Sequence, residues 1–461
     1  MTHLDDTIAA ISTPIGEGGI GIVRLSGSNA INIADRIFLS PKGKKLKDAK
    51  SHTIIYGFII EPATSEKIDE VLVTVMRAPR TYTKEDVVEI NCHGGILPLR
   101  TTLHLLLKEG AMPAEPGEFT KRAFLNGRID LSQAEAVIDV IRAKTEQAEK
   151  LAFQQLEGRL SARITESRNK ITELCVVIEA YIDFPEEDIE IITRDEMISS
   201  IKEIEKKLML LSKGYDEGRL YREGLATAIV GKPNVGKSSL LNILLQKDRA
   251  IVTEMPGTTR DIIEEYLNIN GLPLRIMDTA GIRETHDLAE MEGVKRSLRA
   301  IESADIVIAV LDASRHLDEA DRVLIDKVKH KKTILVVNKC DIESPEFRMF
   351  EPQTPCPVVK VSALDGTGID DLKGAIYALC TSSAGATGVE DLLLTNARHK
   401  HSIDMALKSL GSAGTSLEKG DPLEVIALFL RESLDYLGEI IGVVTTEDIL
   451  NCIFSNFCIG K

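Results

Sequence analysis

The sequence lacks the features that mark several classes of protein. It has seven cysteines in 461 residues, an odd number with no C-x-x-C pair, which argues against a disulfide framework or a structural zinc site and favours a reduced, cytoplasmic setting. No apolar run is long enough to span a bilayer, and the first six residues lack the basic start of a secretion signal. We therefore expect neither membrane insertion nor export. No internal repeat or low-complexity tract is present.

Basic residues are also outnumbered by acidic ones, with 56 lysines and arginines against 71 aspartates and glutamates. The formal net charge is −15 and the isoelectric point is near 5.2, which argues against strong non-specific binding to nucleic acid. A nucleic-acid substrate would have to be held by a local basic patch. The hydrophobic fraction of 43% and the charged fraction of 28% are ordinary for a soluble globular protein, and the length predicts two to four domains.

Residues 231–238, Gly-Lys-Pro-Asn-Val-Gly-Lys-Ser, fit the pattern G-x-x-x-x-G-K-[S/T]. An apolar run at 225–230 precedes them and a helix-like run follows, which is the context of a phosphate-binding loop. Glycines let backbone N–H groups face the phosphates at the positive end of the helix. We expect Lys237 to reach the β- and γ-phosphates and the Ser238 hydroxyl to coordinate Mg²⁺. The other loop residues expected to contact the nucleotide are Asn234, Val235, Gly236 and Ser239.

Three later motifs, each after an apolar strand-like run, identify the nucleotide. Asp278-Thr279-Ala280-Gly281 fits D-x-x-G, whose Asp would hold Mg²⁺ through water and whose Gly amide would face the γ-phosphate. Asn338-Lys339-Cys340-Asp341 fits N-K-x-D, in which the last carboxylate accepts hydrogen bonds from guanine N1 and N2. Adenine cannot supply those donors, so the sequence predicts a GTP-binding domain rather than an ATPase. Ser362 and Ala363 would complete the guanine pocket.

The remaining pattern predicts a multidomain α/β plus α protein. Residues 1–118 contain strand candidates and a helix at 96–108, and are expected to form an N-terminal α/β domain. Residues 119–216 and 383–461 carry apolar residues at helical spacing, while 217–382 hold the nucleotide motifs. The sequence therefore predicts one discontinuous helical domain that is interrupted by an inserted Ras-like P-loop GTPase domain, with a parallel-rich sheet flanked by helices.

Two helix starts and one residue pair can also be predicted. Ser132 with Glu135 three positions later fits a capping box, and Asp421 before a proline fits an N-cap. Arg24 and Glu89 both fall on strand candidates. A strand Arg and Glu most often form a surface pair, so these residues alone do not indicate a site.

Several motifs together resemble a known family along the whole chain. They lie at residues 21–27, 91–95, 116–119 and 123–127, in the Gly-Thr-Thr-Arg-Asp run at 257–261, and in the terminal Cys-Ile-Gly-Lys at 458–461. An inserted GTPase domain followed by that terminal motif is similar to the bacterial tRNA uridine-modifying GTPases known as MnmE or TrmE.

The resemblance implies a homodimer formed through the N-terminal domain, with 5-formyltetrahydrofolate or a related reduced folate bound in the interface. By position, Arg24, Glu89, Arg128 and Lys461 would contact the folate. It also implies an FAD-dependent partner, MnmG or GidA, with which the family adds an aminomethyl or carboxymethylaminomethyl group to C5 of the wobble uridine of certain tRNAs. A free cysteine near a C-terminus is most often inert, but the setting of Cys458 beside Lys461 and the family's terminal motif imply a functional role of open chemistry.

For GTP hydrolysis, Ile282 follows the D-x-x-G motif where many GTPases place a water-orienting glutamine. The resemblance implies that Glu290 acts instead, through a bridging water. It also implies a K⁺ ion that neutralises developing charge when the GTPase domains dimerise. The residues implied to hold the metal ions are Asn234, Thr253, Met255 and Thr258 for K⁺ and Thr259 with Ser238 for Mg²⁺.

Two alternatives stay open at this point. Arg260 or Arg283 could supply an arginine finger in place of the cation. The leading hypothesis is a K⁺-activated GTPase that drives tRNA modification, and the alternative is a GTP-switched RNA or ribosome assembly factor without modification chemistry of its own. A folate site and a functional Cys458 would distinguish the enzyme from the switch.

Overall fold

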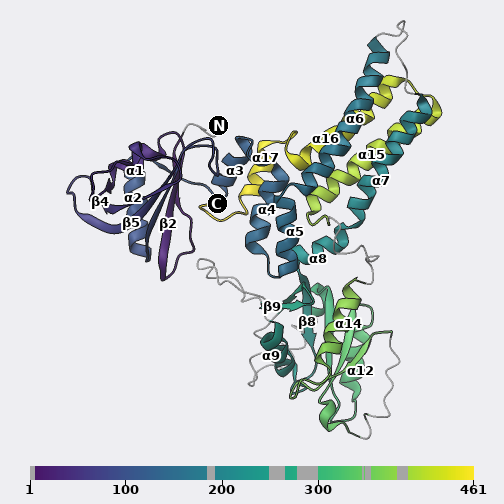
Figure 1. Ribbon diagram of the computed structural model, residues 1–461. Helices are drawn as coiled ribbons and strands as arrows, with labels where there is room; N and C mark the ends of the chain where they lie inside the picture. The colour runs from purple at the N-terminus through teal and green to yellow at the C-terminus, as the bar shows by residue number, and fades with distance from the viewer. Residues whose placement is uncertain are drawn as a thin grey trace.

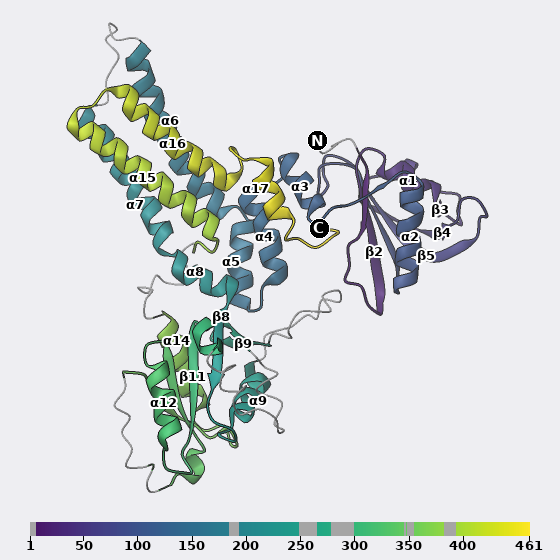
Figure 2. The same ribbon diagram turned by 180° about the vertical axis from the view of Figure 1, so that it is seen from behind.

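The computed structural model describes residues 6–183, 193–248, 265–277, 299–344, 347, 355–381 and 393–461. Figure 1 shows three bodies: an N-terminal sheet with its helices, a long helical body, and a second α/β body attached to the lower end of the helices. The view from behind in Figure 2 shows the same arrangement, with both chain ends where the first body meets the second.

The N-terminal body is a seven-stranded sheet with strand order β3-β4-β5-β6-β2-β1-β7. Helices α1 and α2 cover one face and bury alternate residues of β2, β5 and β6, among them Val23, Val73 and Ile90. The elements are β1 (Ile8–Ile11), β2 (Gly18–Ser26), α1 (Ala30–Arg36), β3 (Phe38–Leu39), η1 (Leu46–Asp48), β4 (Thr53–Ile60), β5 (Lys67–Met76), β6 (Val87–Gly94), α2 (Ile96–Lys108) and β7 (Met112–Pro113).

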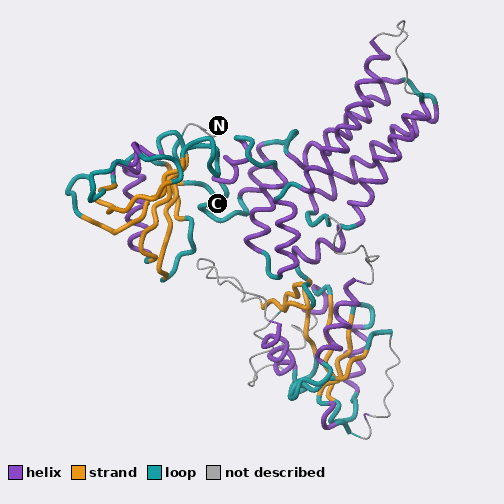
Figure 3. Tube along the Cα trace, viewed as in Figure 1, coloured by secondary structure: helices purple, strands orange, loops and turns teal. Residues whose placement is uncertain are grey.

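The helical body is built from segments on both sides of the second α/β body, as the sequence predicts. Helices α6, α7, α15 and α16 pack as a long bundle around buried residues such as Ile171, Ile204 and Leu430 (Figure 3). Its elements are α3 (Glu118–Leu125), α4 (Leu131–Arg142), α5 (Glu146–Leu156), α6 (Arg159–Asp183), α7 (Arg194–Lys213), α8 (Tyr215–Glu223), α15 (Ala397–Lys419), α16 (Leu423–Ile441) and α17 (Glu447–Phe454).

The inserted body has a six-stranded sheet with order β13-β12-β11-β8-β10-β9, in which only the β9–β10 pairing is antiparallel. Every residue of β8, β11 and β12 is buried, as expected for a parallel sheet covered on both faces. The elements are β8 (Leu225–Val230), α9 (Lys237–Asp248), β9 (Glu265–Ile269), β10 (Leu272–Ile276), β11 (Ile306–Asp312), α12 (Glu319–Val328), β12 (Thr333–Asn338), η2 (Cys340–Ile342), β13 (Val358–Lys360) and α14 (Ile369–Thr381). The predicted fold class is confirmed.

Two predicted helix starts are wrong. Helix α4 is capped by Asp130, which has extended backbone and forms a capping box with Gln133, so Ser132 already lies inside the first turn. Helix α16 begins at Leu423 with Pro422 as its N-cap, because Pro422 is extended at ψ 143°. Asp421 therefore lies one residue outside the cap. Among the described helices, none has the length and apolar character needed to cross a bilayer.

Candidate functional site

The loop between β8 and α9 takes a conformation that ordinary side chains rarely adopt. Gly231, Asn234 and Gly236 have φ of +155°, +64° and +96°. A Cβ on Gly231 would lie 2.5 Å from the Val310 carbonyl oxygen, and one on Gly236 would overlap the Asn338 amide. Both glycines are required by close approach, which keeps the loop backbone free to face a ligand at the start of α9.

Lys237 begins α9 and folds back over the loop. Its ammonium donates to the carbonyl oxygens of Gly231 at 2.9 Å and Lys232 at 2.7 Å, and burial lowers its pKa. Ser238 and Ser239 follow in the first turn of the helix, whose backbone N–H groups have no partner within the helix. Lys237, Ser238 and Ser239 thus lie together at the start of α9 beside the glycine loop, and their contacts to phosphate and Mg²⁺ stay predictions.

Asn338 joins two segments that the sequence assigns to one pocket. It is 2% exposed; its amide nitrogen donates to the Val235 carbonyl at 2.8 Å and its amide oxygen accepts from the Ala363 backbone N–H at 3.0 Å. Ser362, which precedes Ala363 in the sequence, is fully buried, and its backbone N–H donates to the Thr367 carbonyl. The phosphate-binding loop and the 362–363 loop are therefore fixed to each other by one side chain.

The residues after Asn338 turn outward. Lys339 has φ +64° and donates through Nζ to Asp312 Oδ2 at 2.7 Å. Burial alone would raise the pKa of Asp312, but hydrogen bonds from Lys339 and Ser314 lower it below its ordinary value. Asp341 lies two residues further on, in η2, with an exposed side chain. Asp341 thus presents an exposed carboxylate three residues after Asn338, and its role as the guanine-selecting acceptor stays a prediction.

Other predicted nucleotide and metal residues lie outside the described residues. They are Thr253, Met255, Thr258, Thr259, Asp278, Thr279, Ala280, Gly281 and Glu290, together with Ile282 and the alternative arginines Arg260 and Arg283. Their roles remain predictions from the sequence.

A second cluster of predicted residues lies on the N-terminal sheet. Arg24 of β2 pairs in register with Glu89 of β6, and its Nε donates to Glu89 Oε1 at 2.8 Å. Their side chains are 17% and 24% exposed, so this is a partly buried ion pair rather than the surface pair that the residue types alone suggest. The Arg24 guanidinium lies 5.6 Å from the Phe119 ring centroid, and that of Arg128 lies 4.7 Å from the Tyr82 ring centroid.

The chain terminus docks against this cluster. The Gly460 carbonyl accepts from Arg24 at 3.2 Å, and the backbone N–H of Phe119 donates to the Lys461 carbonyl at 3.2 Å. Gly460 has φ +93°, and a Cβ there would overlap the Ile11 carbonyl, so glycine is required. Burial, then Arg24, lowers the pKa of Lys461.

The predicted folate residues Arg24, Glu89, Arg128 and Lys461 thus gather around one cluster, with half-buried Cys458 in the same terminal segment. The sequence reasoning missed Tyr82 and Phe119, the two rings beneath the cations. Nothing local distinguishes these rings from core aromatics, and only their position under Arg24 and Arg128 identifies them.

Comparison with known families covers the whole of this architecture. The family described as GTP-binding protein TrmE N-terminus matches residues 7–128, and the MnmE helical domain matches residues 131–458. The chain belongs to the MnmE family of tRNA modification GTPases. The MnmE family members similar to it include proteins named tRNA modification GTPase MnmE from Acetivibrio thermocellus, 51% identical over all of both chains, and from Alkaliphilus metalliredigens, 50% identical over 99% of this chain and 100% of the relative. That from Bacillus velezensis is 48% identical over the same shares.

Proposed function

We propose that this chain is a K⁺-activated GTPase that drives addition of an aminomethyl or carboxymethylaminomethyl group to C5 of the wobble uridine in certain tRNAs, together with an FAD-dependent partner similar to MnmG. The observation that carries the GTPase half is the Asn338 bridge between the phosphate-binding loop and the 362–363 loop, with exposed Asp341 beside it. The name shared by relatives of about 50% identity supports the tRNA half.

The nucleotide site fits GTP with Mg²⁺. Backbone N–H groups of residues 234–239 would hold the phosphates, Lys237 would neutralise the β- and γ-oxygens, and the Ser238 hydroxyl would be a Mg²⁺ ligand. Asp341 would accept from guanine N1 and N2. When bound, Mg²⁺ supplies charge neutralisation at the transferring phosphoryl group. We further propose that Glu290 orients the attacking water, so that Glu290→Gln lowers kcat while GTP affinity is kept.

Asn234 is the described residue that would bind K⁺. Asn234 is exposed on the phosphate-binding loop and has a φ of +64°. The test is GTP hydrolysis in K⁺ against Na⁺ at equal ionic strength. We expect strong stimulation by K⁺ that disappears in Asn234→Ala and persists in Asn242→Ala, which removes the same amide from an exposed position on α9. Equal rates in both salts would refute the cation mechanism and favour an arginine finger.

The cluster around Arg24 fits a reduced folate. Three cations, Arg24, Arg128 and Lys461, gather near the Tyr82 and Phe119 rings, a combination suited to a ligand that is both aromatic and anionic. We expect the wild-type protein to bind 5-formyltetrahydrofolate in an equilibrium titration, and the Arg24→Ala variant to lose this binding. Arg36→Ala is the matched control, because Arg36 forms an exposed ion pair with Glu109 on the far side of the sheet. Equal weakening in both variants would contradict the assignment.

The open face of the same sheet supports a homodimer. One row of side chains crosses four neighbouring strands of this face, next to the row that holds Arg24 and Glu89. From β2 to β4 this row contains Ile22, Asn91, Leu72 and Tyr56. Exposed apolar side chains on this face or its margin are Ile20 (67%), Ile54 (65%), Tyr56 (47%) and Leu72 (47%). A contiguous exposed apolar patch marks an interaction surface, and we propose that a second copy covers it. Ile54→Glu should shift the protein to a monomer in sedimentation velocity, and an unchanged dimer would reject this face.

Substitution of Cys458 distinguishes an enzyme that modifies tRNA from a protein that only switches with GTP. We propose that Cys458→Ser leaves GTP hydrolysis unchanged but leaves the wobble uridine unmodified when the partner and tRNA are present. Intact modification in that variant would remove Cys458 from the chemistry. If the wild-type protein does not modify tRNA but still binds RNA in a GTP-dependent way, the assembly-factor alternative would be favoured. We propose the domain division 1–118, 119–216, 217–382 and 383–461 for this activity.

A further inference from the structure

The joint between the inserted body and the helical body is a shared hydrophobic core. Ala148 and Leu151 of α5 belong to the same buried cluster as Leu225 of β8 and Leu274 of β10, and Leu393 of the returning chain joins them. Linkers alone would let the inserted body rotate freely. Here a displacement of α5 relative to the sheet would expose apolar surface, so α5 and this edge of the sheet must move together.

The tip of the β9–β10 hairpin also touches α5 directly. The turn residues Asn270 and Gly271 have φ of +53° and +91°, and the Gly271 N–H donates to Asn268 Oδ1 at 2.8 Å. A Cβ on Gly271 would lie 3.3 Å from the Gln147 Cβ, in the first turn of α5. The hairpin tip therefore rests directly on the start of α5.

A second contact lies further along the hairpin. The ammonium of Lys144, in the connection between α4 and α5, lies 5.5 Å from the ring centroid of Tyr266 on β9. A cation over a ring face tolerates small sliding better than a directional hydrogen bond, because the attraction depends on proximity to the ring. The hairpin thus touches the α4–α5 corner at its tip and on its side.

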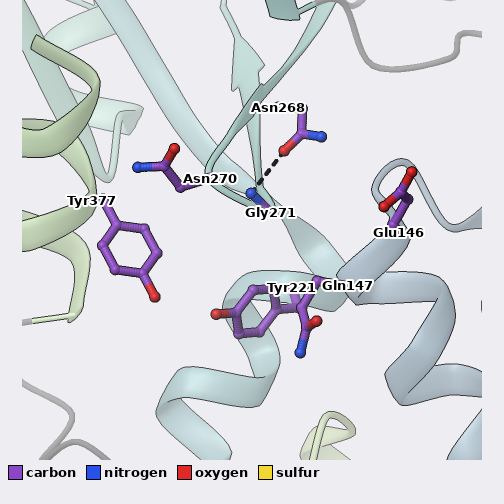
Figure 4. A pocket seen from close by; sticks show the side chains of 7 residues that line it. All are labelled: Glu146, Gln147, Tyr221, Asn268, Asn270, Gly271 and Tyr377. Atoms are coloured by element: carbon purple, nitrogen blue, oxygen red, sulfur yellow. Dashed lines mark hydrogen bonds between the residues drawn. The ribbon is translucent and has the colours of Figure 1, made fainter. Parts of the chain in front are cut away.

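A cavity of about 260 Å³ lies beside the tip (Figure 4). The hairpin, the first turn of α5, α8 and α14 line this open pocket, and the rings of Tyr221 from α8 and Tyr377 from α14 face it (Figure 4). Burial, then the neighbouring Tyr377, raises the pKa of Tyr221, which is 3% exposed. Ile269 and Leu272, which flank the turn, are fully buried in the same core as Leu151 of α5, so a shift of the hairpin is passed on to α5.

The hairpin also connects the two segments predicted to sense the γ-phosphate. Strand β9 begins four residues after the Gly-Thr-Thr-Arg-Asp run, and Asp278 of the D-x-x-G motif comes two residues after β10 ends. The strands pair without a break from Glu265↔Ile276 to Ile269↔Leu272. A continuous antiparallel pair is stiff along its length, so a shift at its open end reaches its tip.

Helix α5 leads from the tip to the rest of the helical body. It packs against α4, whose Asp139 accepts from Arg222 of α8 at 2.9 Å and whose Glu135 accepts from Arg398 and His399 of α15. The two chain connections between the helical body and the inserted body follow α8 and precede α15, and both of these helices bind to α4 through the ion pairs just described. A displacement of α5 has a rigid route into the bundle.

We propose that the β9–β10 hairpin is the contact through which the nucleotide state of the GTPase body reaches the helical body, with Gln147 receiving the hairpin tip. The inference rests on the proposed GTPase function. It assigns the coupling to a side-chain contact rather than to the two chain connections, and it predicts that fixing the contact alters nucleotide preference, because coupling between two sites is reciprocal.

A reversible cross-link tests this in the full chain. The Cβ separation of 3.3 Å is close to that of a disulfide, so Gln147→Cys with Gly271→Cys should oxidise to a clamp. We expect the clamp to change the ratio of affinities for a non-hydrolysable GTP analogue and GDP by about 5-fold or more. Reductant should return the ratio to that of the reduced double variant, and Gln147→Cys alone should match the wild-type protein. A complete cross-link with an unchanged ratio would overturn the inference.

A second measurement avoids the strained Gly271 position. Hydrogen exchange is compared with GDP and with the GTP analogue in the unmodified protein, in Gln147→Ala, and in Glu149→Ala, an exposed position on the other side of α5. We expect nucleotide-dependent exchange in α5 and α8 that Gln147→Ala reduces at least 2-fold and Glu149→Ala retains. Equal responses in both variants would reject the hairpin contact. Failure of the proposed function would differ, since neither nucleotide would then bind.

Discussion

Replacement of Glu135 by Gln tests how strongly the helical body is held together across the insertion. Glu135 of α4 is 5% exposed, and its carboxylate accepts from Arg398 at 2.8 Å and from His399 Nε2 at 2.6 Å. Asn396, the N-cap of α15, donates to the same group at 3.1 Å. The substitution preserves side-chain volume but removes the charge that faces Arg398.

The magnitude follows from the pKa of the carboxyl group. Burial alone would raise the pKa of Glu135, but His399 and Arg398 outweigh it and lower the pKa to about 2. The unfolded-state pKa of a glutamate is about 4.3, and one unit corresponds to ~1.36 kcal/mol, so the interaction contributes roughly 3 kcal/mol. Breaking a buried ion pair from one side costs about 3–5 kcal/mol, which agrees.

The pH dependence has a definite sign. Because the folded-state pKa of Glu135 lies below its unfolded value, the contribution is complete above about pH 5 and is lost as the pH falls toward 2. The carboxylate of Glu135 therefore makes the protein less stable as the pH falls.

The assay is urea unfolding followed by far-UV circular dichroism, since the sequence has no tryptophan for fluorescence. We expect Glu135→Gln to lower the free energy of unfolding of the helical body by about 3 kcal/mol at pH 7, and the difference to narrow toward pH 3. The control is Glu179→Gln, which breaks a pair with Arg431 whose side chains are 42% and 62% exposed, and should cost about 1 kcal/mol or less. Equal losses in the two variants, or a difference independent of pH, would refute the reasoning.

Three further substitutions test the two sites. Asn338→Ala leaves the Val235 carbonyl and the Ala363 N–H without their buried hydrogen-bond partner, at a cost of about 1–3 kcal/mol each. We expect this variant to bind GTP at least about 10-fold more weakly in an equilibrium titration. An unchanged affinity would show that the Asn338 bridge does not support the nucleotide site. Gly236→Ala places a methyl group on the Asn338 amide at a positive φ, and should abolish nucleotide binding while the circular dichroism of the helices is kept. Arg128→Ala removes a cation from over a ring, and should weaken folate binding about 2- to 30-fold without affecting GTP hydrolysis; a loss of both would contradict separate sites.

Much of the nucleotide site could be predicted from the sequence because its determinants are local. The glycines at 231 and 236 are demanded by backbone dihedrals within one loop, and the strand before it and the helix after it are contiguous in sequence. Helix α2 has the bounds that its apolar spacing predicts, from Ile96 to Lys108. Local preference failed at α4, where Asp130 and Ser132 both suit an N-cap and the pairing of Glu135 with His399 commits that carboxylate elsewhere.

The tertiary structure decided the contacts between distant segments. Arg24 meets the Gly460 carbonyl across 436 positions of sequence, and Glu135 meets His399 across 264. The sequence by itself determined which stretches form strands, helices and a phosphate-binding loop, because backbone preference and apolar periodicity act over a few residues. It could not place the chain terminus beneath Arg24 or the hairpin tip on Gln147, because such contacts depend on how whole bodies pack, and packing is set by the sum of many weak apolar contacts rather than by any one motif.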